Sequence, residues 1–208
     1  MRPQKGSNGR LPQNARSLRD LVRYKHLMQR ITVYCGSRPG RGPRYLEAAS
    51  AFGKAAAERG LTIVYGGARV GLMGAVADGA LAAGGRVIGV IPENFVSKEI
   101  AHDELSELHV VTSMHLRKTK LFELADAIVA LPGGVGTMDE WFEMLTWAQI
   151  GLHQKPMGIL NVDGYYDRLL SFLEHTEDEG FMSKEHRGLY CVEALPHALL
   201  DALHQSRP

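Results

Sequence analysis

The chain has 208 residues, a length typical of one α/β domain, and 45% of them are hydrophobic, which is enough for a sizeable core. A formal net charge of +1 argues against nucleic acid or an anionic membrane as partner, and no apolar run is long enough to span a membrane. The chain has only two cysteines, Cys35 and Cys191, and nothing in their pattern indicates a disulfide framework or a zinc site. We therefore expect a cytoplasmic protein with no metal.

In chain order, the first 16 residues are rich in Gly, Pro, Asn, Gln and Arg, which predicts a disordered tail over 1–16 and a single domain over 17–208. A short helix is predicted over 17–29. Beyond it, short apolar runs alternate with segments of helical spacing. The predicted strands cover 31–35, 61–65, 86–91, 108–112, 127–131, 157–160 and 189–192. The predicted helices cover 45–59, 72–83, 115–124, 138–148, 165–179 and a last segment from Pro196.

These strands are continuous apolar runs, a pattern typical of a parallel sheet that is covered on both faces. The fold class is therefore α/β, a single Rossmann-like doubly wound sheet with helices on both faces. Ligands of such sheets bind beyond the carboxyl ends of the strands. Glycine turns follow three strands, at Gly36-Ser37, Gly66-Gly67 and Pro132-Gly133-Gly134. Ser37 and Gly67 are thus candidate contacts. The glycine spacing after 61–65 does not fit a dinucleotide fingerprint, so no nicotinamide cofactor is expected.

The run LPGGVGTMDE over 131–140 is the most informative part of the chain, since it joins an apolar strand to the start of a helix. Glycines let the backbone approach an anion closely, and the free N–H groups of a first helical turn point at it. The sequence therefore predicts a phosphate site here. The expected contacts are Gly133, Gly134, Val135, Gly136 and Thr137.

Two carboxylates, Asp139 and Glu140, follow this turn, where they would repel a bound phosphate. Their presence favours a site that holds a phosphate and performs acid–base chemistry beside it. The alternative is a plain capping box, in which Thr137 is the N-cap and Glu140 its reciprocal partner. The glycine-rich positions before Thr137 are not required by a cap, and this favours the functional interpretation.

Further charged residues follow other strands. Arg117 and Lys118, in the segment that begins at Met114, come after the strand over 108–112, and an Arg can bind a carboxylate or phosphate through two parallel bonds. Arg38, beside Ser37, is either a turn residue or a phosphate donor. Glu99 lies in the loop after the third strand, where acids are usually solvated.

The segment Met114–Lys118 and the run over 132–140 together resemble the LONELY GUY family, whose hallmark is a PGGxGTxxE motif with an upstream RK pair. The resemblance extends over about residues 30–195. It implies a cytokinin riboside 5′-monophosphate phosphoribohydrolase, with Arg117 and Glu140 as the catalytic pair, a phosphate loop over 134–137, and Lys118 and Glu99 as substrate contacts. It also implies a homodimer or a larger homo-oligomer, and the apolar breadth of 141–149 points the same way.

The expected reaction is hydrolysis of the N-glycosidic bond of adenosine 5′-monophosphate or an N6-substituted form, as in AMP nucleosidase or cytokinin biosynthesis, without a cofactor. Met73, Met114 and Trp147 are the candidates for the base pocket. Members of this family are often labelled lysine decarboxylases, but no Schiff-base lysine with a pyridinium partner is evident. The alternative is a nucleotide-binding or molybdenum-cofactor carrier protein on the same fold. The Arg117 and Glu140 pair favours the enzyme.

Overall fold

The computed structural model describes residues 28–96 and 101–206. The tail predicted over 1–16 and Glu99 lie outside these residues, as does the helix predicted over 17–29 up to residue 27. Met28 and Gln29 lead directly into the first strand and are not helical. The domain boundary after residue 16 therefore stays a prediction.

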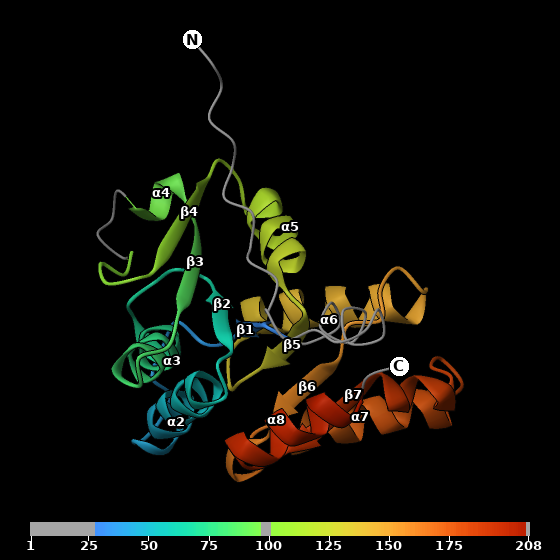
Figure 1. Ribbon diagram of the computed structural model, residues 1–208. Helices are drawn as coiled ribbons and strands as arrows, with labels where there is room; N and C mark the ends of the chain where they lie inside the picture. The colour runs from blue at the N-terminus through green and yellow to red at the C-terminus, as the bar shows by residue number, and fades with distance from the viewer. Residues whose placement is uncertain (1–27, 97–100, 207–208) are drawn as a thin grey trace, which may run out of the picture.

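All seven predicted strands are present and form one sheet (Figure 1). They are β1 (Arg30–Tyr34), β2 (Thr62–Tyr65), β3 (Val87–Pro92), β4 (Glu107–Val111), β5 (Ala127–Ala130), β6 (Met157–Leu160) and β7 (Tyr190–Glu193). Their order is β4-β3-β2-β1-β5-β6-β7, and every neighbouring pair is parallel. The predicted fold class is confirmed.

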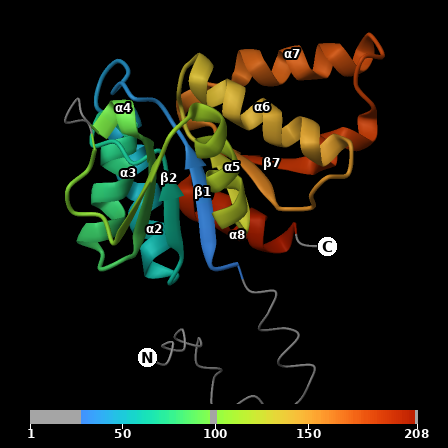
Figure 2. The same ribbon diagram turned by 90° about the horizontal axis from the view of Figure 1, so that it is seen from above.

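Helices cover both faces of the sheet. Alternate residues of each strand point to opposite sides, so the buried strands contribute apolar side chains to both faces. From β1, Ile31 and Val33 join one apolar core, and Tyr34 joins the other. The first core is covered by α2 (Arg44–Glu58), α3 (Gly71–Ala82) and α8 (Pro196–Gln205). The second is covered by α5 (Met114–Leu124), α6 (Val135–Gln149) and α7 (Asp167–Asp178). Figure 2 shows β7 between α7 on one side and α8 on the other.

Three details differ from the sequence prediction. The edge strand β4 is only partly buried, so it is not a continuously buried run. Pro92 lies one residue beyond the strand predicted over 86–91 and is the last residue of β3, because a strand end needs no further N–H bond. The short helices α4 (Glu93–Val96), η1 (Val162–Gly164) and η2 (Lys184–Leu189) were not predicted. Over the described residues, none of the helices is both long and apolar enough to cross a membrane.

The strand order reverses at β1, which pairs with β2 on one side and with β5 on the other. From β1 the chain builds outward to β4, then returns and continues from β5 on the opposite side. The turns that leave β1 and β5 therefore diverge above the sheet. A crevice at this reversal is where open α/β sheets bind their ligands.

Candidate active site

A pocket of about 580 Å³ lies at this reversal. It brings together most of the residues that the sequence predicted for the site: Ser37, Met114, Arg117, Gly133, Gly134, Val135, Gly136, Thr137, Asp139 and Glu140. Gly67 does not line it. That glycine has a φ of +77°, which side chains rarely adopt, and it packs against β3 at Ile91. This backbone conformation explains why a glycine stands at position 67, and no ligand is needed to explain it.

The glycine turn has a different shape from the capping box considered above. Gly134 is the N-cap of α6, with no side-chain cap bond, and the helix begins at Val135 rather than Met138. Thr137 is therefore the third residue of the helix, and the capping-box interpretation is wrong. The N–H groups of the first helical turn lack carbonyl partners within the helix. They are free to bind an anion in the pocket.

The glycines of this turn serve two purposes. A side chain at Gly133 would collide with Thr137, whose Oγ1 lies 2.1 Å from the position of the missing Cβ, so this glycine is needed for packing. Side chains at Gly134 and Gly136 would meet nothing within 4 Å, although both residues line the pocket. The protein's own packing does not require glycine at these two positions, and a bound group would use the open space.

The turn after β1 is fastened to the glycine turn. The N–H of Gly36 donates to the carbonyl of Pro132 (3.0 Å), and the Gly36 carbonyl accepts from the N–H of Leu72 (3.0 Å). Gly71, at φ +58°, allows α3 to begin directly against Ser37. These bonds place Ser37 and Arg38 on the pocket wall beside the glycine turn.

An ion pair between α5 and α6 lies in the pocket wall. Nη1 of Arg117 donates to Oε1 of Glu140 at 2.7 Å, and both side chains are about nine-tenths buried, with exposures of 12% and 10%. Nε of Arg117 donates to the Val90 carbonyl of β3 (3.1 Å). A side chain at Gly66 would lie 2.2 Å from Nη2 of Arg117, so this glycine after β2 makes room for the guanidinium. The pair joins α5 to α6 and is fastened to β3 through Val90.

Burial sets the ionisation of Glu140. Loss of water around the carboxylate raises its pKa above the ordinary range, and the charges of Arg117 and then Lys118 oppose that rise. The nearby carboxylate of Asp139 adds to the rise. The result is a carboxylate that is more basic than usual and held close to a guanidinium, as is expected of a group that stabilises positive charge or activates water.

Lys118 takes a different position from its neighbour. Its Nζ pairs with Asp139 (2.7 Å) and with Glu143 (3.3 Å), and it does not line the pocket. The hydrogen bonds and charges of these two carboxylates outweigh the effect of burial and raise the pKa of Lys118. Lys118 therefore lies behind Asp139, which does line the pocket.

The rest of the pocket is partly apolar. Leu72, Met73 and Met114 line it, and the two methionines are among the three residues predicted around a base. Trp147 does not line it, and its ring packs edge-on against Phe122 of α5, with ring centroids 5.1 Å apart. Tyr45 and Tyr165 line the pocket and were not predicted. Tyr165 follows β6, a third strand end on the same rim, and that position was the available signal.

Residues that would hold a cofactor are not evident in the described part of the chain. No group of three or more His, Cys, Asp or Glu side chains there is arranged for a metal ion. Among the described lysines, none lines the pocket, whereas pyridoxal phosphate needs a lysine for its Schiff base.

A family model described as "possible lysine decarboxylase" matches residues 73–203. The chain is 54% identical to a protein of Rhodococcoides fascians named cytokinin riboside 5′-monophosphate phosphoribohydrolase, over 78% of this chain and 82% of that protein. It is 44% identical to the Arabidopsis thaliana phosphoribohydrolase LOG7, over 88% and 85%. In fold it is similar to a molybdenum cofactor binding protein of Rippkaea orientalis, with a TM-score of 0.66 at 23% identity over 86% and 97% of the two chains.

Proposed function

Because the chain belongs to the family of cytokinin riboside 5′-monophosphate phosphoribohydrolases, we propose that its pocket hydrolyses the N-glycosidic bond of adenosine 5′-monophosphate and its N6-substituted forms. The products are adenine or a cytokinin base, and ribose 5-phosphate. The observation that carries the proposal is the buried pair of Arg117 and Glu140, which lies in the same pocket as an open glycine turn. The glycine turn suits a phosphate, and the ion pair suits a reacting sugar.

The glycine turn and the start of α6 bind the 5′-phosphate. Their N–H groups and the positive end of the helix dipole favour a dianion. Ser37 and Arg38 on the adjacent wall add a hydroxyl and a cation. This anchoring uses binding energy remote from the reacting bond to hold the ribose in place.

Glu140 then acts on the sugar. Departure of the base leaves oxocarbenium character at the anomeric carbon, as in glycoside hydrolysis. The Glu140 carboxylate stabilises that charge and takes a proton from the attacking water, and its raised pKa makes it a better base for this step. The departing base keeps the electron pair of the broken C–N bond and takes a proton from water. Arg117 binds Oε1 of Glu140, which orients the carboxylate and opposes its protonation. The apolar wall formed by Leu72, Met73 and Met114 receives the base.

A carrier without hydrolase activity is the other function considered. The molybdenum-cofactor proteins share the fold at 23% identity, a level that shows the fold alone. A carrier has no need of a buried, basic carboxylate beside the anion site. Lysine decarboxylation is disfavoured because no described lysine lines the pocket.

The test is incubation with AMP and, separately, with adenosine, followed by chromatography of the products. We expect equal amounts of adenine and ribose 5-phosphate from AMP. Adenosine should react slower by on the order of a hundredfold, because without the phosphate the ribose is not positioned. Comparable rates for the two would show that the glycine turn is structural only. Binding of AMP without release of adenine would support the carrier.

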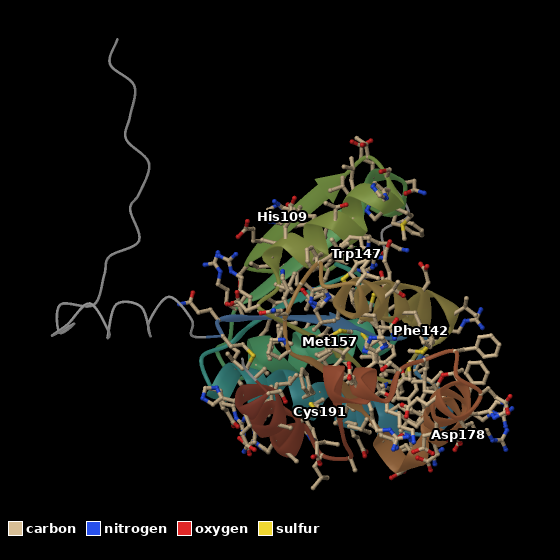
Figure 3. The ribbon with its side chains drawn as sticks, turned by 90° about the vertical axis from the view of Figure 1, so that its right-hand side faces the viewer. His109, Phe142, Trp147, Met157, Asp178 and Cys191 are labelled. Atoms are coloured by element: carbon tan, nitrogen blue, oxygen red, sulfur yellow. The ribbon has the colours of Figure 1, made fainter. Side chains whose placement is uncertain are left out.

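We also propose that the protein is a homodimer. The aromatic breadth of α6 is weaker support than the sequence implied, because Trp141 and Leu145 are buried within the chain and Phe142 packs on the same core (Figure 3). Better support comes from exposed apolar side chains on neighbouring β4 and α5. These are Leu108, Val110, Met114 and Leu116. Such a patch favours an interface, and light scattering on the enzyme preparations used above tests it.

A further inference from the structure

Two adjacent tyrosines after β6 bind carbonyl groups of the glycine turn through their hydroxyls. The hydroxyl of Tyr166 donates to the carbonyl of Leu131 (2.7 Å), and the hydroxyl of Tyr165 donates to the carbonyl of Gly133. The carbonyl between them, on Pro132, accepts from Gly36. Three successive carbonyls of the turn are therefore bound by groups from other parts of the chain.

The bond from Tyr165 has a particular consequence for the anion site. A peptide unit is planar and trans, so its carbonyl and the following N–H point in opposite directions. Tyr165 fixes the Gly133 carbonyl, and this fixes the N–H of Gly134 in the direction away from the tyrosine. A peptide between two glycines has little steric preference of its own. Without the hydroxyl it is free to rotate, and the rotated form replaces a donor by a carbonyl that repels phosphate.

The ring of Tyr165 is itself held in place. It packs edge-on against Tyr45 of α2 and against Tyr166, with centroids 5.5 and 4.7 Å apart. The turn that carries it is fixed by Asn161, whose side chain accepts from the N–H of Tyr166 (2.8 Å) and donates to Asp167 (2.8 Å). The hydroxyl is thus presented to the Gly133 carbonyl by a rigid support.

The two tyrosines differ in burial. Tyr166 is 3% exposed, so its bond to Leu131 lies in the core. Tyr165 is 42% exposed and lines the pocket, so its contribution to stability is small and its hydroxyl acts at the mouth of the site. We propose that Tyr165 is a positioning residue, which locks the Gly133–Gly134 peptide in the orientation that binds the 5′-phosphate. This inference rests on the proposed function.

The experiment compares Tyr165→Phe with Tyr166→Phe, since each removes one hydroxyl and keeps the ring. Ribose 5-phosphate binding is measured by calorimetry, kcat/KM is measured for AMP and adenosine, and thermal unfolding is recorded for each protein. Tyr165→Phe should weaken ribose 5-phosphate binding and lower kcat/KM for AMP by about tenfold, the effect of one hydrogen bond. It should leave adenosine turnover and the melting temperature nearly unchanged. Tyr166→Phe should lower the melting temperature and keep the ratio of AMP to adenosine turnover.

The binding measurement does not depend on turnover, so it separates the failure of this inference from the failure of the proposed function. Equal affinity of wild type and Tyr165→Phe for ribose 5-phosphate would overturn the inference, whether or not AMP is hydrolysed. A lower melting temperature with an unchanged AMP-to-adenosine ratio in Tyr165→Phe would also overturn it, because that result describes a purely structural residue.

Discussion

Two ion pairs join α5 to α6 one residue apart, and they differ in their access to water. Arg117 and Glu140 are both about nine-tenths buried and line the pocket, whereas Lys118 lies behind Asp139, whose side chain is 58% exposed. Successive helical residues are rotated by about 100°, so neighbours in the sequence face different surroundings. In the proposed mechanism the pair of Arg117 and Glu140 performs the chemistry, and the pair of Lys118 and Asp139 only adjusts the ionisation of Glu140.

The largest expected effect comes from removing one charge from each pair with the same isosteric change. Glu140→Gln should lower kcat for AMP by on the order of a hundredfold or more, because it removes the charge that faces the oxocarbenium. Asp139→Asn should remain within a few-fold of wild type. Steady-state assays give both values, and calorimetry should show that Glu140→Gln still binds ribose 5-phosphate. Near-normal turnover in Glu140→Gln would contradict the assigned role.

The sequence was sufficient to predict what depends on local pattern. Strand positions and the glycine turn after β5 follow from continuous apolar runs and glycine spacing, and both are present. The start of α6 was placed three residues late, because Gly136 is a poor helix former while the turn is held by the distant Gly36 and Tyr165. Local propensity carries no information about such partners.

The rest of the site depends on which neighbours each residue contacts. Lys118 and Gly67 follow strands of the sheet but do not line the pocket, and the Trp147 ring packs against Phe122. A pattern of residue types places a residue on an element without stating which neighbours its side chain contacts. Tyr165 was missed because only the pairing of β5 with β6 in the sheet brings the turn after β6 to the glycine turn. The assignment of Glu99 to the substrate stays a prediction.

The next effect concerns stability. Arg117→Gln should destabilise the fold at pH 7 by about 2 kcal/mol, because it leaves the buried Glu140 carboxylate without its partner, and uptake of a proton offsets part of that cost. Lys118→Gln should cost less, about 1 kcal/mol, since its nearer partner Asp139 is exposed to water and only Glu143 is mostly buried. Urea unfolding measures both.

The double variant Arg117→Gln/Glu140→Gln is the control for that measurement. It should recover most of the stability lost in Arg117→Gln, because no buried charge remains. If the double variant is less stable than Arg117→Gln alone, or if Lys118→Gln costs as much as Arg117→Gln, the two pairs do not differ in the way that their burial implies.

The smallest effect is a shift of the acidic limb of the pH profile of kcat. It tests whether Lys118 and Asp139 adjust the pKa of Glu140. Burial raises the pKa of Glu140, Lys118 lowers it and Asp139 raises it. Catalysis needs the ionised carboxylate, so activity is present above this pKa and is lost as the pH falls through it. Lys118→Met should therefore move the acidic limb of kcat to higher pH, and Asp139→Asn should move it to lower pH.

The substrate phosphate also titrates, near pH 6, but it is common to all three proteins and cancels in the comparison. Shifts of the same sign in both variants, or an acidic limb that moves in neither, would show that a group other than Glu140 controls the profile.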